Sequence, residues 1–492
     1  MRHALLACTM LATPALAEEA EGDGGQATIV VTGQAVEGNS ATKTATPPLH
    51  VPQPVTVIDA DLFEAQGAVS IGDTLNYVAG VQPNPYGPDS RVDGAFVRGI
   101  NALQFRDGMR DIFSYYASIR ADPYNFSSVE VVRGPASVLF GAGSIGGLVN
   151  LNSKLPADAA AGEFSLRYGS HERKEALADV TGPLGGGLAG RLVARFRDSG
   201  TQTDFVQDDR LLLAPSLSWT PGADTKVTLL GLYQEDDGGS TAQFLPLVGT
   251  LLPNPNGRLP DDLFIGKPGW DRYDGRLVQG TALAEHRFSD AVKVSAKARY
   301  IDSRLTYLTH YPDSYSNPAN PFVLIDPATG NPVLDPITGT VLRDPQQRMI
   351  GLYSDGSRAR MEIFSTDNMA QFDFATGAEV RHVLVAGVDY SWNRVRKTGG
   401  YGYEYIDLYD VDYAAISDHG GGLPQPSGPS EDVEQDQIGV DHRHRLRHMK
   451  RRRVGLRRRF PLQRLAGDHD RVLAAVDRRL LGKGRRGQHG AG

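Results

Sequence analysis

The feature that most constrains the fold is a two-residue alternation along several long segments after residue 160. In segment 191–197 the even positions are apolar, while positions 191, 195 and 197 carry arginine. Segment 292–300 repeats the pattern, with Val, Ala and Tyr alternating with Lys, Ser and Arg. This is how strands look when one face meets lipid and the other a wet lumen. A soluble sandwich would also alternate, but its strands would not be expected to carry so many rows of arginine and lysine. The pattern therefore predicts an antiparallel all-β membrane barrel.

The connections between these segments alternate in length. Short turns are predicted at 182–187, 220–224, 289–290 and 376–379, and long polar stretches cover 234–280 and 303–361. Structureless loops of that length are improbable in a compact soluble domain, whereas barrels place short periplasmic turns opposite long extracellular loops. After the first residues, no segment approaches 18 uninterrupted apolar residues, which excludes a helical membrane protein.

The first 44 residues predict export and a flexible tether. Residues 1–17 read as a cleaved signal peptide, with Arg2 and His3 before an apolar run that ends in Ala-Leu-Ala. The single cysteine, Cys8, lies inside it, so disulfides are not expected. Residues 18–44 are predicted to be disordered around one β-branched run, Thr28–Thr32. Such a run can add a strand to another protein's sheet edge, although an ordinary edge strand is the alternative.

Residues 45–155 predict one compact α+β unit. A strand is expected at 54–58, a short helix from Asp59, and a second helix from Ser70 to Gly80 with a capping-box start. Strand-like residues from Val129 then enter a glycine-dense turn that spells G-x-G-x-x-G at positions 141–146. The dinucleotide-binding fingerprint needs these glycines to open a helix. Residues 148–152 alternate like a strand instead, so that interpretation is rejected.

Five motifs in this unit carry a family resemblance. They are V-R-G at 97–99, R-D-G at 106–108, D-P-Y at 122–124, VEVVRGPASVLFG from 129 and GGLVN from 146. In this order they resemble the plug domain of TonB-dependent outer-membrane siderophore receptors, most closely the ferric hydroxamate or ferrichrome type. The resemblance implies an N-terminal α+β plug at 45–155 and a plugged barrel of the 22-stranded type. Only about nine or ten strands are recognisable, within a partial barrel at 160–440.

The resemblance also gives the β-branched run near the N-terminus a role. It stands where the family carries its TonB box, the segment that pairs with TonB in the periplasm. The TonB-binding residues that the resemblance implies are Thr28, Ile29, Val30, Val31 and Thr32.

The last 52 residues do not match this pattern. Residues 441–492 contain 17 Lys and Arg against 4 Asp, and their alternation is lost. A basic arm for nucleic acid or anionic lipid and a flexible solvated terminus are two interpretations. The third, which we favour, is an aberrant tail from a shifted reading frame. An incomplete barrel would expose two unpaired strand edges, so a non-functional receptor fragment is an alternative expectation.

No catalytic constellation is present in the sequence. His171-Glu172 lacks the second histidine of a zinc motif, and the serines have no partnered histidine and aspartate. The expectation is a receptor rather than an enzyme, without cofactor or resident metal, because the resemblance implies iron carried as a ferric siderophore complex. It also implies energised uptake through TonB with ExbB/ExbD, an outer-membrane location among its lipids, no nucleic acid and a monomer. Cobalamin or a glycan is the alternative substrate, and a passive pore or a soluble NAD-dependent enzyme is a more distant rival.

Two further groups of site residues follow. Aromatic side chains on outward plug loops offer an apolar face and a hydroxyl donor, and by position Tyr116 matches a ligand-contacting tyrosine of the family. The predicted ligand-contacting residues are Tyr86, Gln104, Phe105, Phe113, Tyr115 and Tyr116. Two arginines resemble plug residues that pair with barrel carboxylates, since a buried guanidinium needs a partner. The predicted plug–barrel latch is Arg98, Glu130 and Arg133.

Overall fold

The computed structural model describes residues 53–112, 115–134, 140, 145–377, 380–425 and 430–448, with side chains described as far as Ile438. The predicted signal peptide and most of the basic tail lie outside these residues. All five residues of the predicted TonB box, Thr28, Ile29, Val30, Val31 and Thr32, also lie outside them. Their pairing with TonB therefore stays a prediction. Within the described part, no helix is long and apolar enough to span a membrane.

The N-terminal α+β unit forms two small sheets and two short helices. Its elements are β1 (Val55–Asp59), α1 (Ala60–Ala65), α2 (Ile71–Thr74), β2 (Val81–Pro83), β3 (Ala95–Val97), β4 (Ile100–Asn101), β5 (Leu103–Arg106), β6 (Met109–Arg110), η2 (Tyr115–Ala117), η3 (Pro123–Asn125), β7 (Phe126–Arg133) and β8 (Gly147–Ser153). The larger sheet has the order β1-β7-β8-β5-β6, and the smaller one β2-β3-β4. Val129 and Val131 of β7 and Leu151 of β8 are fully buried in the core of this unit.

Both helices begin where the sequence predicts. Asp59 caps α1 by accepting a hydrogen bond from the Leu62 amide at 2.9 Å. Ser70 and Asp73 form the predicted capping box of α2. That helix ends at Thr74 rather than at Gly80, because the following amides bond to carbonyls three residues back, as from Val78 to Leu75. The predicted length of the second helix was therefore wrong.

The geometry of β7 and β8 bears on the dinucleotide fingerprint. The two strands pair antiparallel, from Phe126–Ser153 to Arg133–Gly147. A dinucleotide-binding βαβ unit needs parallel strands joined by a crossover helix. The antiparallel pairing supports the rejection of that interpretation.

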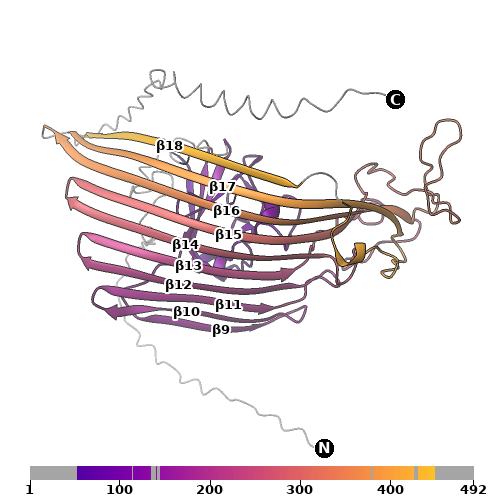
Figure 1. Cartoon of the computed structure of the whole chain (residues 1–492), viewed down its shortest axis with the longest axis horizontal. Coiled ribbons are helices and arrows are strands. Elements are labelled where there is room, and N and C mark those ends of the chain that lie inside the picture. The colour runs from indigo at the N-terminus through magenta and orange to yellow at the C-terminus, as the bar shows by residue number, and fades with distance from the viewer. Residues whose placement is uncertain are drawn as a thin grey trace, which may run out of the picture.

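The rest of the chain forms one curved ten-stranded sheet around the plug (Figure 1). Its strands are β9 (Ala161–Tyr168), β10 (Lys174–Gly185), β11 (Leu188–Asp198), β12 (Asp208–Gly222), β13 (Thr225–Gly238), β14 (Arg272–Ser289), β15 (Val292–Pro312), β16 (Met349–Thr376), β17 (Val380–Asp407) and β18 (Glu431–His448). Each strand pairs antiparallel with the next, so the partial plugged barrel is confirmed. β18 continues to His448, beyond the predicted limit at 440, because its ladder with β17 runs on to Val380.

Short turns gather at one end of the sheet and long connections at the other (Figure 1). The four predicted turns lie between β10 and β11, β12 and β13, β14 and β15, and β16 and β17. The long connections span 239–271, 313–348 and 408–430, and the last contains η4 (His419–Gly421). The first two are shorter than the predicted stretches 234–280 and 303–361, because strands β13 to β16 extend into them.

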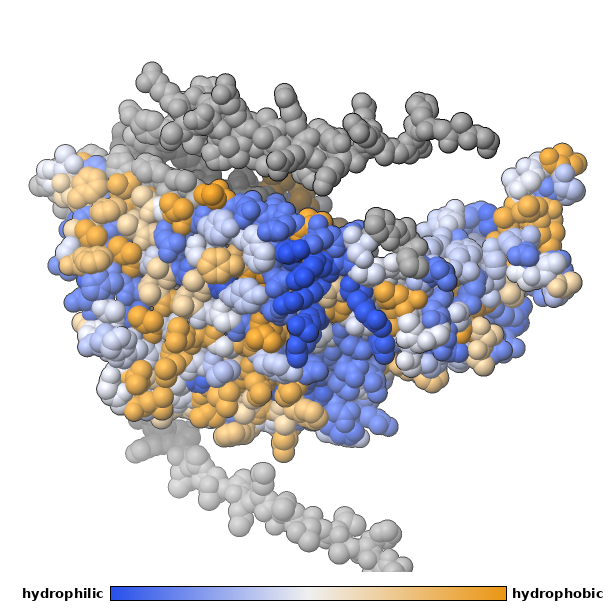
Figure 2. Space-filling model, viewed as in Figure 1, coloured by the Kyte–Doolittle hydropathy of each residue, from blue (hydrophilic) through white to orange (hydrophobic). Residues whose placement is uncertain are grey.

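The alternation of β11 has the predicted consequence. Arg195 and Arg197 point inward and are 3% and 1% exposed, whereas Leu192 and Phe196 point outward and are 45% and 56% exposed. Large apolar side chains cover much of the outer face toward the short turns, as Figure 2 shows. The sheet therefore presents an apolar exterior and a charged interior.

Candidate functional site: the plug–barrel interface and the lumen wall above it

The predicted ligand-contacting residues divide into two environments. Tyr116 is 41% exposed and stacks on Tyr307 of β15, with ring centroids 5.3 Å apart. Tyr86 is 74% exposed and sets its ring against Phe96 of the plug. Tyr116 thus lies beside the barrel wall, where a lumen ligand could reach it, and Tyr86 lies on the plug surface.

The other predicted contacts are less accessible. Gln104 is buried on β5 and donates a hydrogen bond to Asp111 at 2.8 Å. Phe105 is 2% exposed and packs edge-on against Phe140, with centroids 5.2 Å apart. These two residues are part of the plug interior in this structure. Phe113 lies outside the described residues, and only the backbone of Tyr115, in η2, is described.

A row of tyrosines lines the lumen wall at the loop end of three strands. Register places Tyr311 of β15 opposite Tyr353 of β16, and Tyr353 opposite Tyr403 of β17. Tyr401 and Tyr405 share a face with Tyr403, because residues two apart on a strand point to the same side. The ring centroids of Tyr353 and Tyr403 are 4.8 Å apart. We call Tyr307, Tyr311, Tyr353, Tyr401, Tyr403 and Tyr405 the tyrosine wall.

Arg91 joins the plug to this wall. Its guanidinium is 2% exposed, forms two hydrogen bonds with the Asp89 carboxylate at 2.8 and 2.9 Å, and donates to the Tyr307 hydroxyl at 2.8 Å and to the Tyr311 hydroxyl. Burial disfavours the charged guanidinium and is the largest single influence, but the hydrogen bond to Asp89 and the electrostatic effects of Tyr307, Tyr311 and Asp89 together outweigh it, so the pKa of Arg91 is raised. Burial also raises the pKa of Tyr116, which keeps its hydroxyl protonated as a donor.

Two of the three predicted latch residues form hydrogen bonds within the plug. Arg133 donates to the Ala79 carbonyl at 2.8 Å, and Glu130 is fully buried and accepts from Asn152 at 3.0 Å. Arg98 is exposed and has a left-handed backbone, with φ of 54°. Among the described residues, neither arginine forms an ion pair with a barrel carboxylate. In the part of the chain that the structure describes, other side chains form the ion pairs between plug and barrel, and the latch role of Arg98, Glu130 and Arg133 stays a prediction.

Asp122, which caps η3, is the centre of that latch. Its carboxylate is fully buried and accepts from Arg195 of β11 at 2.9 and 3.0 Å and from Arg210 of β12 at 3.0 Å. Burial alone would raise the pKa of Asp122, but the two guanidiniums hold it well below its ordinary value. Arg195 also pairs with Glu175 of β10 at 2.6 Å, and Arg210 with Asp236 of β13 at 2.5 Å.

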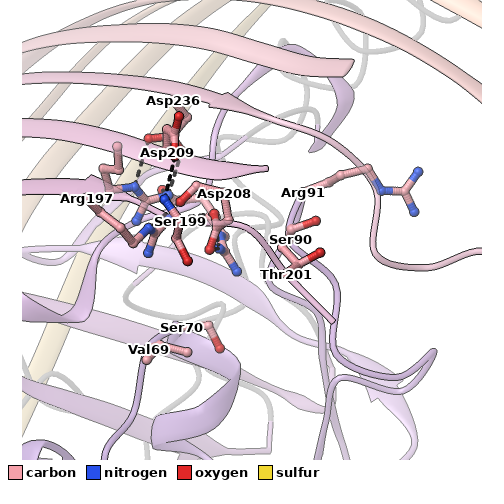
Figure 3. A network of polar contacts seen from close by, with 12 residues as sticks. Val69, Ser70, Ser90, Arg91, Arg197, Ser199, Thr201, Asp208, Asp209 and Asp236 are labelled. Atoms are coloured by element: carbon pink, nitrogen blue, oxygen red, sulfur yellow. Dashed lines mark hydrogen bonds and ion pairs between the residues drawn. The ribbon is translucent and has the colours of Figure 1, made fainter. Parts of the chain in front are cut away.

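Arg120 of the plug extends this network, here with the positive charge on the plug and the carboxylate on the barrel strand. Arg120 donates two hydrogen bonds to Asp208 of β12, at 2.7 and 2.8 Å, and Asp208 also pairs with Arg197 of β11. The carbonyl of Arg120 accepts from Gln234 of β13 at 2.9 Å. Figure 3 shows the barrel side of the network, where Arg197, Asp208 and Asp236 gather on neighbouring strands. The network spans four strands, from β10 to β13.

A third contact uses the turn between β5 and β6. Asp107 accepts from the guanidinium of Arg299 on β15 at 2.7 Å, and its carbonyl accepts from Lys297 at 2.8 Å. The same carboxylate accepts from the amide and hydroxyl of Ser153, both at 2.9 Å. Asp107 therefore joins the β5–β6 turn to β8 within the plug and joins both to β15 of the barrel sheet.

Sequence reasoning quoted the motifs but missed these roles. Asp122 and Asp107 stand within D-P-Y and R-D-G, and their partners are inward arginines of the alternating strands. The signal was the placement of Arg195, Arg197 and Arg299 at lumen-facing positions, where a buried charge requires a partner. The tyrosine wall had a signal too, since Tyr401, Tyr403 and Tyr405 alternate. The described residues contain no group of three or more metal-ligating side chains placed to hold a metal ion.

Comparison with known proteins matches this architecture. Residues 47–148 match the family model described as TonB-dependent Receptor Plug Domain. The ferrioxamine B receptor of Salmonella typhimurium (strain SL1344) is 31% identical over 401 residues, which cover 80% of this chain and 53% of that protein. The ferrichrome outer membrane transporter/phage receptor of Escherichia coli (strain K12) is 28% identical over 450 residues, covering 88% and 57%. The chain spans about half the length of the curated relatives it matches.

Solved structures show the same fold. The open form of the ferric-catecholate import receptor Fiu from E. coli K12 superposes with a TM-score of 0.69 at 21% identity, covering 84% of this chain and 60% of that one. The ferripyoverdine receptor of Pseudomonas aeruginosa gives 0.66 at 19% identity, covering 83% and 51%. This chain carries a TonB-dependent receptor plug domain and is homologous, over the plug and the adjoining strands, to the TonB-dependent siderophore receptors.

Proposed function

We propose that this chain is the plug and the adjoining barrel strands of an outer-membrane receptor that takes up a ferric siderophore, energised through TonB. The observation that carries the proposal is the tyrosine wall above a plug that buried ion pairs fix to the lumen. The relatives named for ferrioxamine B and ferrichrome support a hydroxamate-type ligand. The iron is cargo, already wrapped by the siderophore's oxygens, so the protein contributes no metal ligand and no covalent chemistry.

The wall suits such a ligand. Tyrosines 401 and 403 are 46% and 44% exposed, and Tyr116 of the plug offers a 41% exposed ring that stacks on Tyr307 of the wall. A phenol ring presents apolar area at small entropic cost and a hydroxyl that can donate to a ligand carbonyl. Ligand contact with Tyr116 would be transmitted to η2, which leads directly to Arg120 and Asp122 of the latch.

Transport would follow from release of the latch. We propose that Thr28–Thr32 adds a strand to periplasmic TonB, coupled to ExbB/ExbD, by main-chain hydrogen bonds. The β-branched Ile29, Val30 and Val31 at its centre favour the extended backbone that such pairing needs. Pulling on this segment would separate the plug from the wall, which requires Asp122 and Asp107 to leave their arginines. The buried pairs thus keep the path closed until work is supplied.

Uptake of radiolabelled iron tests the proposal. The full chain is expressed in iron-starved cells that lack their own siderophore receptors. Ferrioxamine B, ferrichrome and a catecholate complex, each loaded with radiolabelled iron, are compared with radiolabelled cobalamin and a radiolabelled glycan. We expect uptake of a trihydroxamate complex that disappears without TonB and in a Val30→Pro variant, since proline removes a donor from the added strand. Gln34→Pro, outside the box, is the matched control.

The remaining outcomes discriminate among the alternatives. Uptake of cobalamin or a glycan with the same TonB dependence would reassign the substrate and keep the coupling. Uptake that persists without TonB would indicate a passive pore. Membrane insertion without binding or uptake of any of these ligands would show that the chain is a non-functional receptor fragment.

A further inference from the structure

A carboxylate at the loop end of the tyrosine wall has no cationic partner. Asp313 directly follows β15, and its amide donates to the Gly351 carbonyl of β16 at 2.8 Å. Its half-buried side chain accepts hydrogen bonds from the Tyr403 hydroxyl at 3.0 Å, from the Ser316 amide at 3.3 Å and from the Ser316 hydroxyl. All three donors are neutral. Among the residues that the structure describes, no lysine, arginine or histidine forms an ion pair with Asp313.

A glycine makes room for the contact between Tyr403 and Asp313. Gly351 of β16 lies opposite Tyr405 in the register of β16 and β17. A Cβ atom at Gly351 would overlap the Tyr403 hydroxyl and would lie 3.2 Å from the Asp313 side chain. The missing side chain therefore lets the Tyr403 hydroxyl reach the carboxylate, and the turn to Ser316 holds the carboxylate from its other oxygen.

Aromatic rings surround this carboxylate on the lumen face. The ring centroid of Tyr403 lies 4.8 Å from that of Tyr353 and 5.3 Å from that of Tyr405. Tyr403 is 44% exposed, so its ring is accessible from the lumen. The face of an aromatic ring attracts a cation electrostatically. Neutral rings around a fixed negative charge therefore form surroundings that suit an ammonium group.

Two cations of these strands and their connections have other carboxylates near them. Arg348 pairs with Asp407 at 2.8 Å. Lys397 of β17 acts electrostatically on Asp355 of β16. Asp313 thus differs from the carboxylates of the latch, each of which is paired with arginine. A half-buried carboxylate without a counter-charge gains more from a ligand cation than an exposed one does, because solvent screens it less.

We propose that Asp313, with the rings of Tyr353, Tyr403 and Tyr405, binds a primary ammonium group of a hydroxamate siderophore and makes the receptor prefer cationic over neutral complexes. The proposal rests on the proposed function. The ammonium supplies charge-assisted hydrogen bonds to the carboxylate and lies against the ring faces. Six residues of extended chain, roughly 20 Å, separate Asp313 from Tyr307 at the plug end of the wall. A chelate that contacts Tyr307 therefore reaches Asp313 only through a pendant arm that carries the amine.

Paired binding measurements test the proposal. The full chain in non-ionic detergent is titrated with ferrioxamine B, whose free amine is cationic, with its neutral N-acetyl derivative and with neutral ferrichrome. We expect the wild type to bind ferrioxamine B roughly tenfold more tightly than the acetylated complex. In Asp313→Asn, which keeps the shape and an acceptor for Tyr403, this ratio should fall below about twofold. Asp261→Asn is the matched control, because Asp261 is an exposed loop carboxylate paired with Arg258, and it should keep the wild-type ratio.

Salt dependence gives a second measurement that needs no variant. In the wild type, the preference for ferrioxamine B should shrink as NaCl rises from roughly 0.05 M to roughly 0.5 M, because salt screens the charge pair. Equal affinity of the wild type for the free and acetylated complexes would overturn this proposal and leave the proposed function standing. A ratio that Asp313→Asn leaves unchanged would place the cation elsewhere and overturn it too. Binding of none of the three complexes would overturn the proposed function and this proposal with it.

Discussion

At the scale of single residues, buried ion pairs join the plug to the barrel strands. The side chains of Asp122 and its two arginines are each at most 2% exposed, and three hydrogen bonds join them. Removing one member of a buried pair leaves the other charge uncompensated, which costs more than the pair itself contributes. Residues of this kind make the plug position sensitive to a single substitution.

Asp122→Ala should therefore destabilise the plug strongly. It leaves Arg195 and Arg210 without their shared partner, at a cost of about 3–5 kcal/mol. Limited proteolysis in detergent should cut the plug much faster than in the wild type. Lys174→Gln, which breaks an exposed pair with Asp198, is the control and should change stability by less than about 1 kcal/mol. Equal plug protection in both variants would contradict the role of the latch.

Asp93 predicts a distinct pH dependence. Burial raises the pKa of Asp93 to about 6 despite nearby Arg120, and its Oδ2 is buried with no hydrogen-bond partner among the described residues. The folded state then binds this proton more tightly than the unfolded state, whose carboxyl pKa is about 4. The stabilisation is complete below about pH 4 and is lost as the pH rises through about 6.

Asp93→Asn should remove this dependence. The amide copies the protonated carboxyl, so the variant's Tm should exceed that of the wild type at neutral pH, and the gap should close near about pH 4. Thermal unfolding in detergent across this range checks the effect. A gap that widens on acidification would show that the carboxylate, rather than the acid, is the form that the fold stabilises.

At the scale of elements, the two-residue period predicted much of the barrel. It gave the strands, the four short turns and the inward arginines of β11, since every second side chain must meet a different solvent. It could not show that β13 to β16 continue into the predicted loop stretches, because there the apolar side chains, such as Ile350 and Leu352, pack against the long connections rather than face lipid. It also could not choose the latch, because pairing depends on which plug loop meets which strand. Arg98 and Arg133 were predicted from motif position alone.

The tyrosine wall is the element with the clearest functional prediction. Tyr116→Ala and Tyr307→Ala should each weaken binding of the ferric siderophore by roughly tenfold, since each removes one ring of a stacked pair. Equilibrium titration, in which the ferric siderophore quenches the protein's fluorescence, would measure the change in Kd. Tyr168→Ala removes an 81% exposed ring on β9, distant in register from the wall, and should bind normally. Equal losses in all three variants would indicate general damage to the fold.

At the scale of the whole molecule, the plug is held at separate places by contacts that share no partner. Asp122 engages β11 and β12, whereas Asp107 engages β15 on the far side of the sheet. Asp122 and Asp208 belong to one network, because Arg210 bonds Asp122 and the backbone of Arg120, whose side chain holds Asp208. A force that pulls on one part of the plug therefore acts unequally on the Asp122 network and on the Asp107 contact.

Double-mutant cycles should reveal this organisation. Asp122→Ala and Asp107→Ala should be additive in the free energy of unfolding to within about 0.5 kcal/mol, because neither shares a partner with the other. Asp122→Ala and Asp208→Ala should be non-additive by about 1 kcal/mol or more, because loss of Asp122 loosens Arg210, which also bonds the backbone of Arg120, the residue whose side chain binds Asp208. Denaturant unfolding of the three single and two double variants measures the coupling free energy of each pair. Strong coupling between Asp122 and Asp107 would mean that the plug detaches as one rigid body, and the stepwise release that separate contacts imply would have to be abandoned.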